Sequence, residues 1–282
     1  MHLGRLDPAP DEILVCADGC SDGTLELLKE QPSIRTIVHE RAAGSIPSRN
    51  ELGRACVSDV FVSLDDDSYP LDPDFIAQVR SVFGRHRRLA VVGFAQRSDE
   101  FPESLAMSAF GHAQFVGTFA NSGAAIRRDV FLELGGYPEF FFHAYEEPDF
   151  ALRCVCAGWQ VWYEPSLLVR HHFTAVQRNE VRTHQRHARN EFWSIVLRCP
   201  MPQLFLIAAF RGLRQLGYAA RRGPAWILQE PRWWGQAIGG ICRCLEQRRP
   251  LPWRRYLAWM RLVRRPIDSE VEWNALFGSA AT

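Results

Sequence analysis

Val60-Phe-Val-Ser-Leu-Asp-Asp-Asp-Ser68 joins a short apolar run directly to three consecutive carboxylates. The run is rich in β-branched and aromatic residues, which predicts a buried strand over 60–64. Open α/β sheets bind ligands at the carboxyl ends of their strands, so Asp65, Asp66 and Asp67 would lie at a binding edge. Three adjacent carboxylates repel one another unless a cation lies between them. We therefore expect Mg²⁺ or Mn²⁺, held with substrate phosphates, rather than a solvated turn that only caps the next helix.

The flanking segments alternate between predicted strands and predicted helices. Strands are expected over 12–17, 34–39, 89–94, 159–163 and 167–173. Helices are expected over 25–30, 49–57, 74–83, 129–134 and 149–157. A β–α–β opening implies a parallel, doubly wound sheet, so we predict an α/β fold with a mostly parallel sheet.

The charge distribution divides the 282 residues into two parts. Residues 1–177 carry 15 Lys/Arg and 25 Asp/Glu, a net charge of −10, whereas residues 178–265 carry 18 Arg and 4 Glu, a net charge of +14. We therefore predict a catalytic α/β domain over 1–177 and a basic, Trp-rich helical extension over 178–282.

A second carboxylate cluster consists of Glu146, Glu147 and Asp149. Asp149 stands at a predicted helix start, where free N–H groups favour a carboxylate, and Arg153 four residues later would pair with it. The two glutamates lack such a structural role and follow an aromatic segment. A desolvating environment raises the pKa of a carboxylate and suits a general base.

Five motifs in order across 12–173 together resemble a family 2 glycosyltransferase with the GT-A fold. They are Ala17-Asp-Gly-Cys-Ser-Asp-Gly-Thr24, then Gly44 with Arg49-Asn50, Asp65-Asp66-Asp67, Asn121-Ser122-Gly123 with Gly135-Gly136, and Glu146-Glu147-Pro-Asp149 with Arg153, Gly158 and His171. The resemblance implies a nucleotide-sugar donor, a divalent ion and inversion at the anomeric carbon.

The resemblance also assigns roles to residues by their position in these motifs. The expected contacts to the nucleotide sugar are Asp18, Arg49, Asp65, Asp66 and Asn121. The expected metal ligands are Asp65, Asp67 and His171. Glu147 stands where the family usually has the Asp that deprotonates the acceptor, and Glu146 is the rival base.

Two departures from the family pattern keep other functions open. The family has a further strand and helix before the strand at 12–17, and the sequence starts too late to contain them. A Glu replaces the usual Asp at position 147. The alternatives are a non-catalytic sugar-nucleotide-binding or scaffold protein and a metal-dependent phosphohydrolase.

The extension places Trp among Arg, a composition typical of helices at membrane interfaces. We expect peripheral contact with an anionic membrane through Trp233 and Trp234, and hence a lipid-linked or saccharide acceptor of the cell envelope. A helical cap on the catalytic domain is the second interpretation, and nucleic acid is the least favoured partner. Eight unpaired-looking Cys and no long apolar run favour a cytoplasmic protein, peripheral on the inner face of the plasma membrane.

Overall fold

The structure is a computed structural model that describes residues 2–173 and 179–278. Its strands are β1 Ile13–Asp18, β2 Ile34–His39, β3 Val60–Ser63, β4 Ser68–Pro70, β5 Leu89–Ser98, β6 Gln114–Phe115, β7 Ala124–Arg127 and β8 Gln160–His171. The helices before residue 174 are η1 Leu3–Arg5, α1 Thr24–Lys29, α2 Ser45–Ala55, α3 Phe75–Arg85, η2 Pro102–Leu105, α4 Arg128–Glu133, η3 Glu139–Phe141 and α5 Glu146–Ala157. The helices after residue 178 are α6 Glu180–Arg198, α7 Gln203–Arg222, α8 Pro224–Ile227, α9 Glu230–Gly239, α10 Ile241–Glu246, α11 Trp253–Arg264 and α12 Glu270–Phe277.

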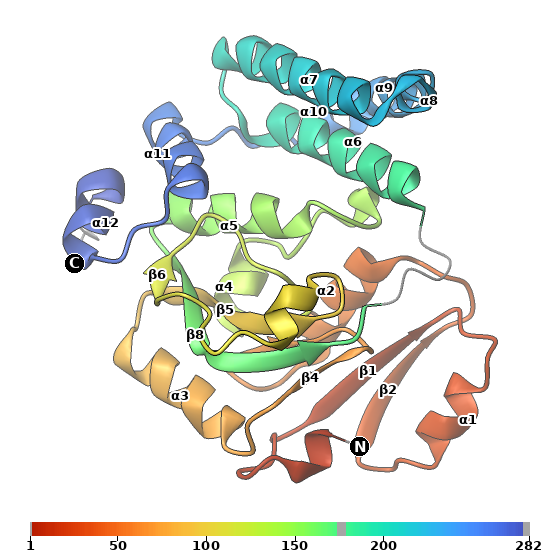
Figure 1. Ribbon diagram of the computed structural model, residues 1–282, viewed down its shortest axis with the longest axis vertical. Coiled ribbons are helices and arrows are strands. Elements are labelled where there is room, and N and C mark those ends of the chain that lie inside the picture. The colour runs from red at the N-terminus through yellow and green to blue at the C-terminus, as the bar shows by residue number, and fades with distance from the viewer. Residues whose placement is uncertain (1, 174–178, 279–282) are drawn as a thin grey trace.

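A central sheet has the strand order β3-β7-β5-β8-β4, with β6 paired to β8 outside that path (Figure 1). This confirms the predicted α/β class with a helical extension. The sheet is mixed, however: β5 and β8 are parallel, whereas β7, β4 and β6 run antiparallel to their neighbours. A parallel pair of strands requires a long crossover connection, usually a helix. Strands β4, β6 and β7 each follow a loop or turn instead, and they run antiparallel to their neighbours.

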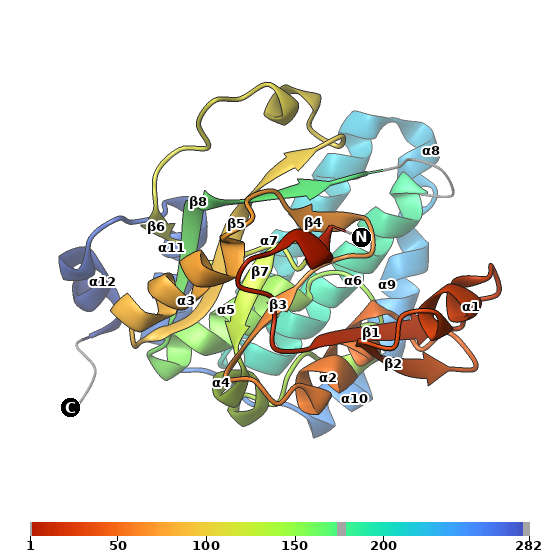
Figure 2. The same cartoon turned by 90° about the horizontal axis from the view of Figure 1, so that it is seen from below.

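Strands β1 and β2 form a separate parallel pair beside α1 (Figure 2). Within the described part of the chain, β1 pairs only with β2, and β3 pairs only with β7. The apolar side chains of β1 and β3 are mostly only half-buried, in contrast to the buried residues of β5. The pair is held to the rest of the protein mainly through α2.

The two faces of the central sheet are covered by different helices because side chains alternate along a strand. Val92 of β5 faces α3, which contributes Phe75 and Val79 to that core. The neighbouring Val91 points to the opposite face, where α5 and then the helices of the extension pack. Figure 1 shows the resulting layers, with α3 below the sheet and α5, α6 and α7 stacked above it.

Two local features differ from what the sequence pattern suggests. Tyr69-Pro70, a dipeptide that usually favours a turn, belongs to the short edge strand β4, since a Pro is tolerated where no ladder N–H is needed. The strands expected over 159–163 and 167–173 form one strand, β8, whose register against β5 shifts between Phe94 and Ala95. The turn-like residues around Pro165 mark this bulge rather than a chain reversal.

Asp149 attaches the extension to the α/β layers. Its fully buried carboxylate accepts bonds from Arg153 Nε at 2.9 Å, Ser194 Oγ at 2.8 Å and Arg198 Nε at 3.1 Å. The pairing with Arg153 was predicted, and the two partners from α6 were not. One hydrophobic core also runs from α5 into α6 and α11. The predicted division at residue 177 lies outside the described residues and stays a prediction.

The tryptophans expected to insert into a membrane lie inside the extension. Trp233 is only 1% exposed, and its indole N–H donates to Glu230 Oε2 at 2.7 Å. Trp234 stacks on Trp233 and packs against Gly212 of α7. The prediction was therefore wrong for Trp233, which packs inside the extension, whereas Trp234 is half-buried. Contact of the protein with a membrane stays a prediction. Among the described helices, none combines the length and apolarity needed to cross a membrane.

Candidate functional site

The predicted metal ligands converge at the junction of β3, β4 and β8. Asp65 and Asp67 follow β3, and the turn is closed by a hydrogen bond from Asp65 N–H to Ser68 Oγ at 2.8 Å. The β4–β8 pairing sets Ser68 opposite His171, and His172 N–H donates to the main-chain oxygen of Asp67 at 2.8 Å. The strand pairing thus brings residues about a hundred positions apart to one point.

This cluster has a donor set that fits a divalent ion. Ligand atoms of Asp65, Asp67 and His171 all lie within 4.8 Å of one another, and His171 Nε2 is 3.3 Å from Asp67 Oδ1. Two carboxylates suit Mg²⁺ or Mn²⁺, and a buried imidazole nitrogen among them favours the transition metal. Asp66 is exposed and lies outside this group of three.

Arg49 of α2 lies between the two acidic clusters. Its guanidinium forms an ion pair with Asp65 and donates to Ser63 Oγ at 2.7 Å. The same positive charge acts to lower the pKa of Glu146 and Glu147, which places both glutamates in its electrostatic neighbourhood. Arg49 therefore contacts Asp65 directly and acts on the glutamates of α5 through its charge.

The glutamate pair opens α5 and is held by Asn121. Asn121 is buried, and its N–H donates to Glu147 Oε1 at 3.3 Å while its Nδ2 donates to Glu146 Oε1 at 3.4 Å. Glu146 is buried, and no described residue bonds its Oε2. Glu147 is half-buried, so of the two carboxylates it is the more accessible to an acceptor.

Burial and mutual repulsion change the acidity of this pair. Desolvation, followed by the charge of Glu146, raises the pKa of Glu147 to about 8. Desolvation also raises the pKa of Glu146, in spite of the opposing charge of Arg49. A carboxylate whose pKa is raised toward neutral pH is a stronger base in its ionised form, which suits a group that accepts the proton of an acceptor.

The segment before the pair has an unusual backbone that the sequence pattern did not reveal. Phe142, Ala144 and Tyr145 all have positive φ, at 67°, 74° and 69°. Non-glycine residues rarely adopt this region, and such strain concentrates at functional sites. Asn190 of α6 is fully buried and donates to the main-chain oxygens of this segment. The contacts are Phe141 O at 3.2 Å, His143 O at 2.8 Å and Ala144 O at 2.7 Å.

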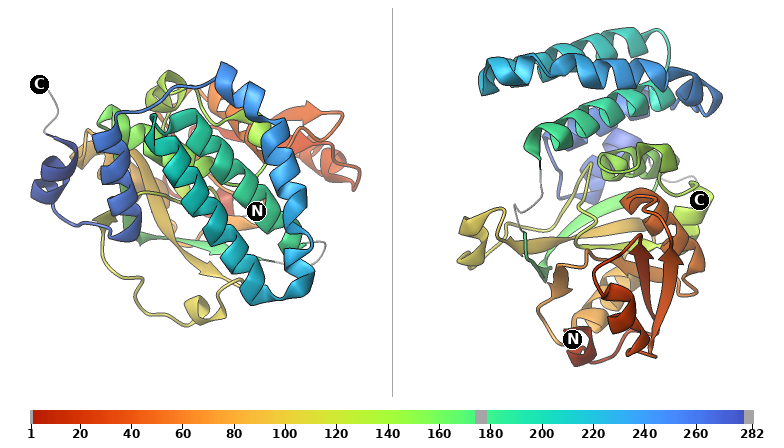
Figure 3. Two further views of the ribbon diagram at one scale, coloured as in Figure 1. Left: turned by 90° about the horizontal axis from the view of Figure 1, so that it is seen from above. Right: turned by 90° about the vertical axis from the view of Figure 1, so that its right-hand side faces the viewer.

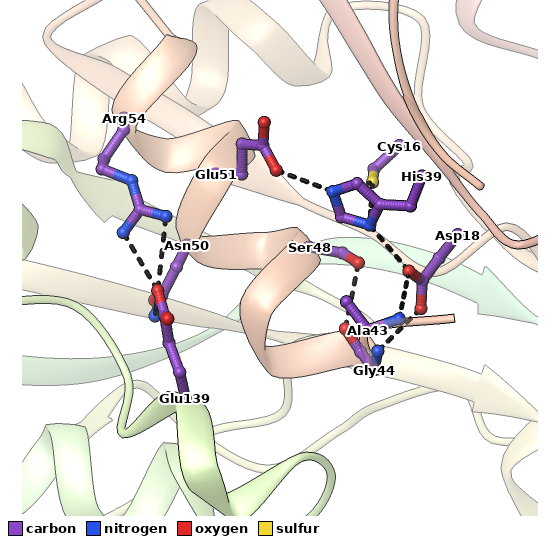
Figure 4. A network of polar contacts seen from close by, with 10 residues as sticks. All are labelled: Cys16, Asp18, His39, Ala43, Gly44, Ser48, Asn50, Glu51, Arg54 and Glu139. Atoms are coloured by element: carbon purple, nitrogen blue, oxygen red, sulfur yellow. Dashed lines mark hydrogen bonds and ion pairs between the residues drawn. The ribbon is translucent and has the colours of Figure 1, made fainter. Parts of the chain in front are cut away.

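Asp18, predicted to contact the nucleotide base, lies in the network drawn in Figure 4. It accepts from the N–H groups of Ala43 and Gly44 at 2.7 and 2.8 Å and pairs with His39 Nδ1 at 2.7 Å. Burial would raise the pKa of Asp18, but these bonds outweigh it and keep that pKa below its usual range. The carboxylate thus anchors the loop before α2, and its contact with a nucleotide stays a prediction.

His39 has a carboxylate on each ring nitrogen. Its Nδ1 faces Asp18, and its Nε2 lies 2.7 Å from Glu51 Oε2 of α2. These two hydrogen bonds, the one to Asp18 being the larger effect, raise the pKa of His39. The charged imidazolium is therefore favoured, since only that form donates from both nitrogens.

Two cavities lie away from both acidic clusters. One of about 260 Å³ is lined by residues of α6 and α9, including Arg182, Gln185 and Arg232. The other, of about 300 Å³, is lined by residues of α3 and by Ser166. The side chains that can carry chemistry lie at the sheet edge instead, and they form the candidate site.

Comparisons with known proteins agree with this arrangement. The model of a family described as glycosyltransferase like family 2 matches residues 3–190. The O-antigen chain rhamnosyltransferase RfbN of Salmonella typhimurium is 25% identical over 189 residues, which is 61% of this chain. The match spans about 60% of the length of that relative.

Solved structures show the same fold at low sequence identity. The mannosyltransferase PcManGT from Pyrobaculum calidifontis, in complex with GDP-Man and Mn²⁺, is 16% identical with a TM-score of 0.55, covering 93% of this chain and 78% of its own. TarS residues 1–349 from S. aureus, in complex with UDP, is 13% identical with a TM-score of 0.60, covering 93% and 82%. The family match and these structural likenesses together establish that the chain belongs to glycosyltransferase like family 2 and has the GT-A fold.

Proposed function

We propose that this protein transfers a sugar from a nucleotide-diphosphate sugar to an acceptor hydroxyl, with inversion at the anomeric carbon. The observation that supports it most is the meeting of two acidic clusters around Arg49. Asp65 and Asp67 with His171 form one, and the glutamate pair of α5 forms the other. A glycosyl transfer needs charge neutralisation on the leaving group and a base for the acceptor, and these clusters match the two needs.

The proposed reaction is a single displacement. Glu147 takes the proton of the acceptor hydroxyl, whose oxygen forms a bond to the anomeric carbon as the bond to the diphosphate oxygen breaks. The diphosphate leaves with the bonding electron pair, and the configuration at carbon inverts. Arg49 adds positive charge beside Asp65, and Asn121 keeps both glutamates oriented.

The donor set at the edge of β3 would hold Mn²⁺ or Mg²⁺ through Asp65, Asp67 and His171. When bound, such an ion neutralises charge on the departing diphosphate. The complexes of GT-A relatives with Mn²⁺ and a nucleotide or nucleotide sugar support this choice. Asp18, Asp66 and Asn121 are the proposed further contacts of the nucleotide sugar.

The acceptor is proposed to belong to cell-envelope polysaccharide or glycolipid synthesis. RfbN, by its name, is a rhamnosyltransferase of the O-antigen chain, which supports this class of acceptor. Acceptors of this class are built on lipid carriers, so we place the protein peripherally on the cytoplasmic face of the plasma membrane.

The test is incubation of the protein with Mn²⁺ and a panel of nucleotide sugars, with and without lipid-linked saccharide acceptors. Sugar transfer to an acceptor, followed by NMR assignment of the new anomeric linkage as inverted, is the expected result. Release of phosphate without transfer would instead indicate a phosphohydrolase. Binding of nucleotide sugar with no turnover under any condition would indicate a non-catalytic binding protein.

A further inference from the structure

Helix α7 lies in the outermost layer above the sheet (Figure 3). It turns an apolar face away from the rest of the protein. Five large apolar side chains are exposed on this face: Phe205, Leu206, Phe210, Leu213 and Leu216, with exposed fractions of 62%, 74%, 51%, 70% and 41%. Ala209 and Ala220 on the same helix are also exposed. Monomeric proteins rarely expose so continuous an apolar surface unless something covers it.

These side chains occupy one face of the helix. At about 100° per residue, the exposed apolar positions from 205 to 220 fall within an arc of roughly 140°. A helix of this length extends for roughly 30 Å, so the face is a long, flat stripe. Only apolar residues and Gly217 stand inside that arc.

The opposite face of α7 is fixed to the protein, so the helix cannot rotate to hide the stripe. Gln215 donates to the buried carboxylate of Glu191 in α6 at 2.7 Å. At Gly212, an added Cβ would lie 2.6 Å from the ring of Trp234, which shows how closely α9 approaches. Ala219 is fully buried on the same side.

The charged residues of α7 itself are all positive. Its sequence contains no Asp or Glu, and Arg214 and Arg221 border the apolar arc on one side. Arg214 is paired with the buried Glu191 of α6. Arg221 is exposed, and no described residue forms an ion pair with it. A twofold contact between two copies through this face would set Arg against Arg, whereas anionic lipid supplies the complementary charge.

Two further exposed apolar residues follow the end of α7. Ile227 and Leu228 are 41% and 81% exposed, and α8 packs back against the last turns of α7 through Trp226 and Tyr218. Arg222 lies over the ring of Trp226, which keeps a further cation at this end.

We propose that α7 is a membrane-docking helix that lies in the plane of an anionic bilayer. Its apolar stripe would enter the boundary between headgroups and acyl chains, and Arg221 at its border would contact lipid phosphates. This surface differs from the tryptophans that the composition pointed to, because Trp233 is buried. The docking does not depend on any catalytic step.

The experiment measures flotation of the full chain with vesicles of 70% phosphatidylcholine and 30% phosphatidylglycerol. The test variant carries Leu206→Ser, Phe210→Ser and Leu213→Ser, which remove exposed groups only. The matched control carries Leu27→Ser, Val57→Ser and Val271→Ser, three exposed apolar residues on other elements. We expect the wild type and the control to float and the test variant to lose binding at least tenfold, and binding should weaken with salt and without phosphatidylglycerol.

Equal flotation of the test variant and the control would overturn the proposal, as would the absence of binding by the wild type. Light scattering in the absence of vesicles tests whether a second copy of the chain covers the stripe instead. A wild-type dimer that becomes monomeric only in the α7 variant would assign the stripe to a second copy instead. The flotation experiment contains no substrate, so a negative result does not bear on the proposed glycosyl transfer. A negative result in the transfer assay likewise does not bear on membrane docking.

Discussion

Asn190 of α6 donates a hydrogen bond to the main-chain oxygen of Ala144, two residues before Glu146. Through this amide and its contacts to Phe141 and His143, the extension holds the backbone that leads into the glutamate pair. The same helix α6 supports α7, since its Glu191 is bonded to Gln215 and Arg214. Helix α6 therefore contacts both α7, which carries the proposed lipid-facing surface, and the segment that leads to the proposed base.

Asn190→Ala should lower turnover without a matching loss of donor affinity. The main-chain oxygens of His143 and Ala144 lose their donor, whereas Phe141 O keeps the hydrogen bond from Arg189 Nη2 at 2.9 Å. The positive-φ segment can then relax and shift Glu147. A misplacement of about 1 Å at a reacting group can reduce the rate by about 10²-fold. Steady-state kinetics should show a lower kcat with a nearly unchanged KM for the donor. Asn274→Ala in α12 is the control, and an equal effect of both variants would argue for general destabilisation only.

Asp67→Asn should weaken Mn²⁺ binding strongly and nearly abolish activity. A hard cation loses a charged oxygen ligand at the point where His171 and Asp65 also converge. Titration of the free protein with Mn²⁺, followed by electron paramagnetic resonance, measures the effect without any substrate. Asp66→Asn is the control for metal affinity, because Asp66 is exposed and lies outside the cluster. Unchanged Mn²⁺ affinity in the Asp67 variant would remove it as a ligand.

Glu147→Gln should reduce turnover by about 10²-fold or more while donor binding survives. The amide cannot accept the proton of the acceptor, and general base catalysis contributes roughly that factor. Donor binding, measured by calorimetry, reports on the metal and nucleotide contacts alone. If Glu146→Gln is inactive and Glu147→Gln retains turnover, the roles of the two carboxylates are exchanged.

The pH profile provides an independent measure of the base. Since the base acts in its ionised form and its pKa is raised to about 8, kcat/KM should rise with pH through about 8 and level off above it. Glu146→Gln removes a neighbouring negative charge that contributes to this raised pKa. Its ascending limb should therefore move to lower pH. A limb that stays in place, or moves to higher pH, would mean that Glu146 does not act on the titrating group.

The sequence predicted the strands well where they are β-branched runs. The segments at 34–39 and 60–64 match β2 and β3 closely, because their local preference agrees with their tertiary setting. The direction of the strands was less predictable. Pairing depends on how long loops return to the sheet, and β7 follows such a loop into an antiparallel position.

The site was predictable as a set of residues but not as a geometry. Asp67 and His171 meet only because β4 pairs with β8, and Tyr69-Pro70 gives no local sign of that strand. The role of Asn190 could not be predicted from the sequence, since a single Asn in a helix forms no local pattern. Trp233 was wrongly predicted to contact a membrane. Composition indicates the environment that a residue type prefers, but it does not show which neighbours bury the residue.

His39→Gln should destabilise the protein in a pH-dependent manner. The folded-state pKa of His39 is raised above its unfolded value of about 6.5, so its contribution to stability is fully present below that value. As pH rises through the folded pKa, the imidazolium loses its proton and the contribution is lost. Glutamine can still donate one hydrogen bond but carries no charge for Asp18 and Glu51. Thermal unfolding of both proteins should therefore show the largest difference in Tm near pH 6 and a shrinking difference toward pH 9. A difference that stays constant over this range would show that His39 acts through packing rather than through its charge.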